Sequence, residues 1–157
     1  MTRLGFLLTA MLGLASNVVA PVPAAAQDTG VTGAAEAAFP NGATFNGISL
    51  KGVTLGQGMF IAPGGSATGQ FQAVLLGTSL LGAAQNITVE GEVGGGSVGA
   101  DGSATFSGTA TVDMGDGTLP LPGVPFTVTA SAGSLGLILN AVALPTATVT
   151  AGSITIK

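Results

Sequence analysis

Hydrophobic and polar residues alternate along most of the chain from about residue 44 onward, and this period of two is typical of strands with one buried face. The alternation predicts strands over residues 67–75, 86–93, 103–113 and 125–131. Over 86–93, for example, Ile87 and Val89 share one face, whereas Glu90 and Glu92 share the other. One apolar face and one polar face suit an antiparallel sheet over a single core.

Two segments reverse this phase midway. The even positions before Gly152 are polar threonines, and after Gly152 they become Ile154 and Ile156, which predicts a one-residue bulge at Gly152-Ser153. Residues 44–55 shift in the same way at Gly47 and Gly52. Strands that change face in this way bend at the corner of a sandwich or barrel.

Turn-forming pairs such as Asn41-Gly42, Asp101-Gly102 and Asp116-Gly117 separate the predicted strands. We therefore predict an all-β fold, an antiparallel β-sandwich or a partly closed barrel of about eight or nine strands. The expected core is Phe45, Phe71, Ile87, Val89, Phe106, Val112, Phe126, Val128, Val149, Ile154 and Ile156.

The N-terminal segment has the pattern of a secretory signal peptide. Arg3 precedes an apolar run from Leu4 to Leu14, and Ala26 ends a small-residue cleavage pattern. We predict a signal peptide over 1–26, a flexible Ala/Gly-rich leader over 27–42, and a single β-sandwich domain over 43–157. This organisation predicts a secreted protein, extracellular or periplasmic, with no membrane span in the mature chain, because later apolar runs are too short.

The composition is glycine-rich and acidic, with 27 glycines, 6% charged residues and a formal net charge of −4. Three basic residues cannot form a patch for nucleic-acid phosphates. The chain lacks Cys and His, so it has no thiolate nucleophile, disulfide or imidazole base. We expect no catalytic residues, no cofactor and no enzyme activity.

One pair of carboxylates is the exception that a hydrolytic alternative would use. Glu90 and Glu92 lie two residues apart on one strand face, so their carboxylates are about 7 Å apart, within the range of an inverting glycosidase. The sequence offers no aromatic platform for a sugar beside them. The pattern is more typical of two solvated side chains on a strand edge or an outer face.

A weak calcium site is a further alternative. Asp113 and Asp116 flank a Gly-containing turn and provide two carboxylates, fewer than a dedicated calcium loop normally contains. Threonine rows at 109/111, 127/129 and 146/148/150 would suit a surface-binding module, although Thr is also the ordinary residue of a wet strand face.

The Pro-rich stretch 119–125 is predicted to be an extended loop, because proline withholds the N–H that a strand needs. Its apolar residues Leu119, Leu121 and Val124 either seal one end of the fold or bind a partner. Few charged side chains are available to prevent exposed strand edges from pairing with another copy, so weak self-association is also predicted. The leading hypothesis is an exported, non-enzymatic domain that binds or assembles at the envelope or outside the cell, with an unknown partner there.

Overall fold

The computed structural model describes residues 26–157, so nearly all of the predicted signal peptide lies outside the described residues. Within that range every element is a β-strand, and all strands belong to one antiparallel sheet. The strands are β1 (Thr29–Ala38), β2 (Thr44–Phe45), β3 (Ile48–Ile61), β4 (Ser66–Thr78), β5 (Ile87–Val98), β6 (Ala104–Asp113), β7 (Leu121–Ala130), β8 (Ser134–Leu139), β9 (Val142–Ala143) and β10 (Ala147–Ile156).

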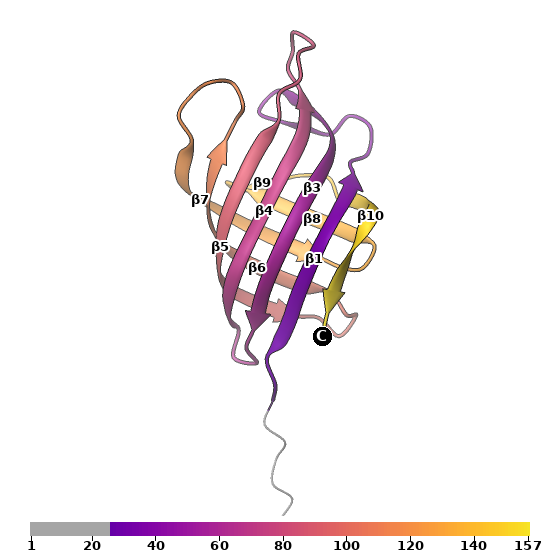
Figure 1. Ribbon diagram of the computed structural model, residues 1–157, viewed down its shortest axis with the longest axis vertical. Helices are drawn as coiled ribbons and strands as arrows, with labels where there is room; N and C mark the ends of the chain where they lie inside the picture. The colour runs from indigo at the N-terminus through magenta and orange to yellow at the C-terminus, as the bar shows by residue number, and fades with distance from the viewer. Residues whose placement is uncertain (1–25) are drawn as a thin grey trace, which may run out of the picture.

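The sheet curls into a ring because β1 pairs with β10 on one side and with β3 on the other (Figure 1). The short strands β2 and β9 pair with β3 and β8 outside this ring. The joint between β8 and β10 is the thinnest, with two paired residues on each strand. The all-β antiparallel prediction is confirmed, and of its two arrangements the partly closed barrel is the one observed.

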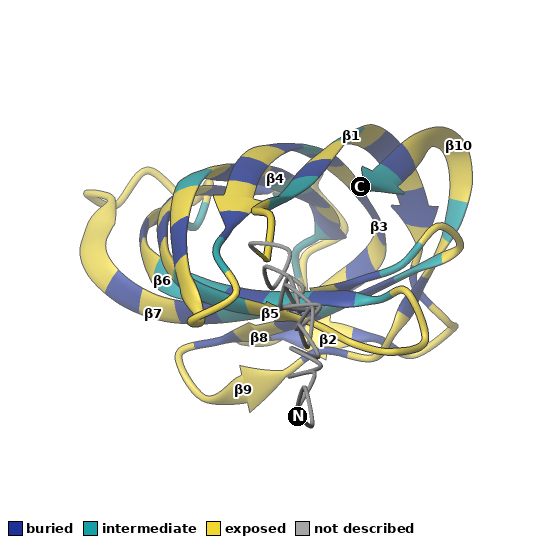
Figure 2. Cartoon of the chain, turned by 90° about the horizontal axis from the view of Figure 1, so that it is seen from below, coloured by how far each residue is buried: buried dark blue, intermediate teal, exposed yellow. Residues whose placement is uncertain are grey.

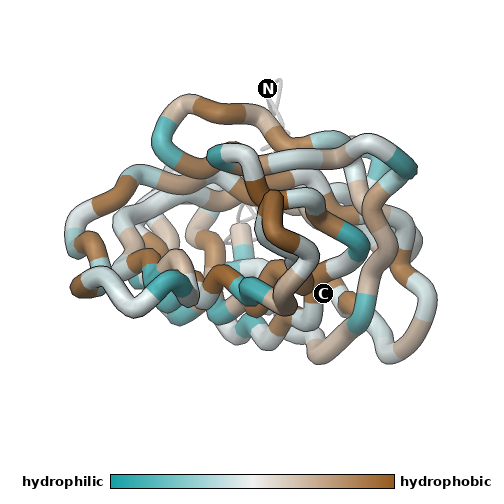
Figure 3. Tube along the Cα trace, turned by 90° about the horizontal axis from the view of Figure 1, so that it is seen from above, coloured by the Kyte–Doolittle hydropathy of each residue, from teal (hydrophilic) through white to brown (hydrophobic). Residues whose placement is uncertain are grey.

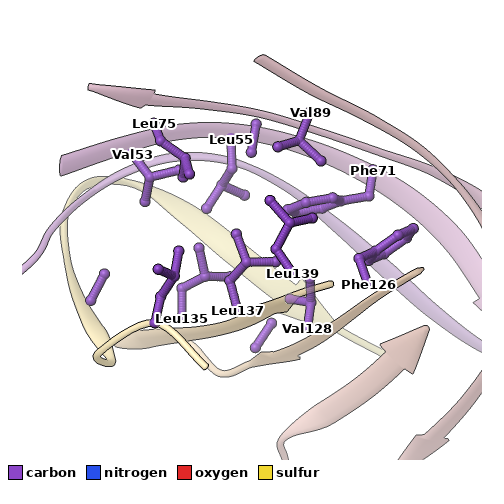
Figure 4. Packing of buried hydrophobic residues seen from close by; sticks show 14 of the residues in the cluster. Val53, Leu55, Phe71, Leu75, Val89, Phe126, Val128, Leu135, Leu137 and Leu139 are labelled. Carbon is purple, nitrogen blue, oxygen red and sulfur yellow. The ribbon is translucent and has the colours of Figure 1, made fainter. Parts of the chain in front are cut away.

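Apolar side chains fill the inside of the ring. Buried and exposed residues alternate along the strands (Figure 2), and side chains from β3, β4 and β5 meet those from β7 and β8 (Figure 4). Phe71 is fully buried, and its ring centroid lies 5.8 Å from that of Phe106 and 5.5 Å from that of Phe126. Gly91 leaves the room that the Phe126 ring occupies, because a Cβ at Gly91 would lie 2.6 Å from that ring.

The predicted core is largely confirmed. Nine of its eleven residues are buried, and the two exceptions, Val149 and Ile156, are partly buried and pack against the same cluster.

The predicted flexible leader over 27–42 is wrong, because most of it forms β1. This strand pairs with β10 and β3 along its length and buries Val31, Ala35 and Ala37. Alanine and glycine have low strand propensity, so the residue pattern does not indicate this strand. Pairing with β10 and β3 stabilises it. The small residues also allow close approach, since a Cβ at Gly33 would lie 2.8 Å from the Ser153 carbonyl oxygen. Residues 29–38 therefore belong to the folded domain, which was predicted to begin at residue 43.

The phase shifts have different causes from one site to the next. At Asn46-Gly47 the chain reverses, with φ of 48° and 81°, so this shift is a tight hairpin between β2 and β3 rather than a bend. The shift at Gly52 is confirmed as an irregularity in the β3–β4 register. In β10 the register against β1 slips between Val149 and Ala151, so the bulge lies at Thr150 and not at the predicted Gly152-Ser153. The buried face changes across it, as predicted.

The Pro-rich stretch is only partly a loop, which corrects the sequence prediction. Strand β7 begins at Leu121 and pairs with β6 and β8. The register with β6 shifts around Pro122 and Gly123, so a bulge accommodates the proline without a ladder hydrogen bond.

The loops gather at the two ends of the ring. The C-terminus and the first residues of β1 lie at the lower end in Figure 1, where Gly30 and Lys157 exchange backbone hydrogen bonds. The segment 39–47, which includes β2, and the longer loops 79–86 and 114–120 lie at the opposite end. Residues 26–157 contain no helix long and apolar enough to cross a membrane.

Candidate functional site

Polar side chains form two parallel rows on the outer face of β4, β5 and β6. Strand register places Gln70 opposite Glu92 and Glu92 opposite Thr109 in one row. In the next row it places Gln72 opposite Glu90 and Glu90 opposite Thr111. Cross-strand partners have Cβ atoms about 4.5–5.5 Å apart, so the members of each row are direct neighbours.

These rows line a hollow of about 360 Å³ that Gly123 of β7 borders on the far side. A second hollow of about 290 Å³ adjoins it toward β3 and is bordered by Thr54, Gly56 and Thr88. Gln72 and Glu90 line both hollows. We call the two hollows together the polar groove; it crosses the strands from β3 to β7, with Gln72 and Glu90 at its middle.

Missing side chains help to shape this surface. A Cβ at Gly56, Gly58 or Gly123 would have no other residue's atom within 4 Å, so the backbone there is open to solvent. Gly56 lies opposite Gln72 and Gly58 opposite Gln70 across the β3–β4 pair. Gln70 and Gln72 therefore lie beside a stretch of β3 without outward-facing side chains, Gly56 and Gly58, which we call the glycine ledge. A ligand could approach the β3 backbone there.

The groove suits hydrogen bonding to an uncharged, hydroxyl-rich ligand. The Gln amides and Thr hydroxyls both donate and accept, whereas the ionised Glu carboxylates only accept. Its lining contains two carboxylates and no basic side chain, so it is unsuited to an anion. Acid catalysis by Glu90 or Glu92 would need one carboxyl held protonated by burial, yet both glutamates are exposed.

An exposed aromatic residue, which the sequence analysis missed, lies on the same outer face. Phe60 on β3 is 63% exposed and lies opposite Thr68, two residue pairs beyond Gly58 and Gln70. Its ring extends toward β1, since a Cβ at Gly30 would lie 3.7 Å from its Cε1 atom. In the alternation of inward and outward residues along β3, Phe60 occupies an outward position. That position in the sequence pattern could have identified Phe60 as an exposed residue.

The predicted calcium ligands Asp113 and Asp116 instead accept hydrogen bonds within their own turns. Asp113 accepts a hydrogen bond from the Gly115 N–H at 2.8 Å. Asp116 accepts hydrogen bonds from the Thr118 hydroxyl at 2.6 Å and N–H at 2.9 Å, and these hold the pKa of its carboxyl below the ordinary value. In the described part of the chain, no three acidic side chains are grouped so that they could hold a metal ion.

The threonine rows do not form one array. Thr109 and Thr111 lie in the polar groove, whereas the row at 146/148/150 belongs to the segment around β10, which β8 separates from β7. The hypothesis of a single flat hydroxyl surface therefore loses its geometric basis.

The predicted partner-binding residues are divided between surface and core. Leu119 is 93% exposed and Leu121 60% exposed, whereas Val124 is buried and offers no surface. The loop after β4 adds two residues that the sequence analysis passed over, Leu80 and Leu81, at 89% and 95% exposure. We call Leu80, Leu81, Leu119 and Leu121 the apolar loop end; Figure 3 looks onto this end of the ring, where brown stretches mark apolar residues.

Comparisons with protein-family models, with curated proteins and with solved structures find no match to this chain.

Proposed function

We propose that the chain is an exported, non-enzymatic domain that binds a partner at the cell envelope or outside the cell through the polar groove. The observation that supports this most strongly is the arrangement of the groove itself. It gathers two amides, two carboxylates and two hydroxyls on three neighbouring strands. A wet strand face needs polar residues, but it does not need a hollow that crosses several strands.

The test compares binding of the purified, exported protein to intact cells of its source. Exchanging Gln72→Ala together with Glu90→Gln removes donors and acceptors from the middle of the groove. Each lost hydrogen bond costs about 1 kcal/mol, so binding should weaken roughly tenfold or more. Thr148→Ala on β10 and Asp28→Asn near the N-terminal end of the fold are the controls, because both residues are exposed and lie outside the groove lining. Equal binding by the groove variant and the controls would refute the proposal.

Export is the second part of the proposal and rests on the residues before the described fold. If residues 1–26 are removed on secretion, the extracellular or periplasmic protein begins at Gln27. N-terminal mass spectrometry of the recovered protein measures this directly. A product that retains Met1 outside the cell would refute the cleavage.

A hydrolytic role for Glu90 and Glu92 remains the enzymatic alternative, and the exposure of both carboxylates makes it the weaker proposal. It predicts that Glu90→Gln abolishes release of reducing sugar from a polysaccharide while leaving binding intact. The binding proposal predicts no such release from the wild-type protein. The same reducing-end assay therefore separates the two.

Self-assembly is a second candidate function, and the apolar loop end favours it. Three of its four leucines are at least 89% exposed, a concentration that monomeric proteins rarely carry without a partner. The ring leaves few open strand edges, so copies would meet through these leucines rather than by adding a strand. Sedimentation over a broad concentration range should show association that Leu81→Ser with Leu119→Ser removes. A wild-type protein that stays monomeric throughout would refute this candidate.

A further inference from the structure

We propose that the ligand of the polar groove is a neutral carbohydrate chain, with Phe60 as the platform on which one sugar ring stacks. This inference rests on the proposed function, because it names the ligand class of the same groove. It adds Gly58 and Phe60 of β3 to the groove, so that the binding surface extends toward β1.

The order of residues across the strands supports a chain-like ligand. Phe60, Gly58 and Gly56 follow one another along the outer face of β3. Across the strands from the two glycines come the two glutamines of β4, then the two glutamates of β5, and then the threonines of β6. An aromatic face at one end and hydrogen-bonding groups along the rest match the two surfaces of a sugar. The C–H face of a pyranose packs on an aromatic ring, and its hydroxyls bond amides and carboxylates.

The charges indicate that this carbohydrate is neutral. Glu90 and Glu92 lie on the same side of β5, and no basic side chain lines either hollow. Uronic acids, sulfated sugars and phosphates would bring negative charge against the two carboxylates without a cation to compensate. Sugar hydroxyls can instead donate to those carboxylates in charge-assisted hydrogen bonds.

The pairing of Phe60 with small neighbours also indicates a platform rather than a misplaced core residue. Its cross-strand neighbours are Thr68 on β4 and Gly30 on β1, neither of which covers the ring. The inward positions on either side of it, Met59 and Ile61, are buried. A large aromatic ring is therefore held on the solvent side of the strand, where burial in the folded domain cannot be its role.

The experiment measures retention of the exported protein by immobilised saccharides. The probes are a neutral β-linked glucan, a neutral α-linked glucan, a panel of neutral oligosaccharides and a polymer of uronic acid. We expect retention by at least one neutral probe and none by the acidic polymer. Phe60→Ala and Gln72→Ala should each weaken retention by roughly fivefold or more. The matched control is Leu121→Ala, because Leu121 has nearly the same exposed fraction as Phe60 but lies at the loop end.

The outcomes separate this inference from the proposed function. If no neutral probe is retained, or if Phe60→Ala binds as well as wild type, the carbohydrate inference is overturned. If cell binding still depends on Gln72 and Glu90 in that case, the groove remains a binding surface for another class of ligand. If neither saccharide retention nor cell binding responds to groove variants, both proposals fail. Stronger retention by the uronic-acid polymer than by the neutral probes would also overturn the assignment.

Discussion

Replacing Gln57 by methionine should stabilise the protein, because this glutamine is a polar residue in an apolar interior. Its side chain faces inward on β3 between Leu55 and Met59 and is 8% exposed. Among residues 26–157, neither its amide nitrogen nor its amide oxygen has a hydrogen-bond partner. A buried polar group without a partner costs about 1–3 kcal/mol, and a methionine of similar length keeps the volume while removing both polar atoms.

Gln57→Met should therefore raise the free energy of unfolding by about 1–3 kcal/mol. For a domain of this size, each kcal/mol corresponds to roughly 4 °C in Tm. The chain contains no Trp or Tyr, so unfolding by heat or urea is best followed by far-UV circular dichroism. Gln70→Met on the outer face is the control and should change stability by less than about 0.5 kcal/mol. A loss of stability in Gln57→Met would refute the reasoning, since it would mean that the amide is satisfied in the folded protein, for example by an ordered water.

Three further predictions follow from burial, close approach and charge. Phe106→Ala should destabilise the fold by about 3–5 kcal/mol, whereas Thr109→Ala on the wet face should cost far less; equal losses in urea denaturation would contradict the facing of β6. Gly33→Ala should lower the melting temperature by several degrees, because the added Cβ would lie too close to the Ser153 carbonyl oxygen of β10 and such overpacking costs about 1–3 kcal/mol. An unchanged Tm would contradict the close pairing of β1 with β10. Hydrogen bonds within their turns lower the pKa values of the Asp101 and Asp116 carboxyls from 3.8. Their contribution to stability is therefore present above pH 3.8 and is lost as the pH falls below it. A variant with both residues changed to Asn should show a flatter dependence of stability on pH in acid, and an unchanged dependence would contradict this.

The sequence predicts the all-β class well because most strands carry a clean alternation of large apolar and polar residues. It fails at β1, where Ala and Gly carry the same alternation with too little contrast to be noticed. The Asn46-Gly47 pair is by itself a strong signal for a hairpin turn. The hairpin was not predicted because the change of buried face at these residues was interpreted as a bend within a single strand. Closure of the ring depends on β1 pairing with both β10 and β3, and such long-range pairing leaves no local pattern.

The candidate site was only partly predictable, for a related reason. The proximity of Glu90 and Glu92 follows from their spacing along one strand. Their neighbours Gln72 and Thr111 come from other strands, and only the register reveals them. Phe60 was overlooked because a Phe in a strand normally faces the core.

Photocrosslinking in intact source cells tests the central claim, that this protein binds its partner through the polar groove, most directly. A photoreactive amino acid is exchanged for Thr111 in the groove, for Leu119 at the apolar loop end, or for Thr148 on β10, all three of which are exposed. Adducts appear as a mass increase of the recovered protein. Binding through the groove predicts adducts with a partner from position 111 and none from 148. Partner adducts from position 119 alone would contradict the claim and assign binding to the loop end.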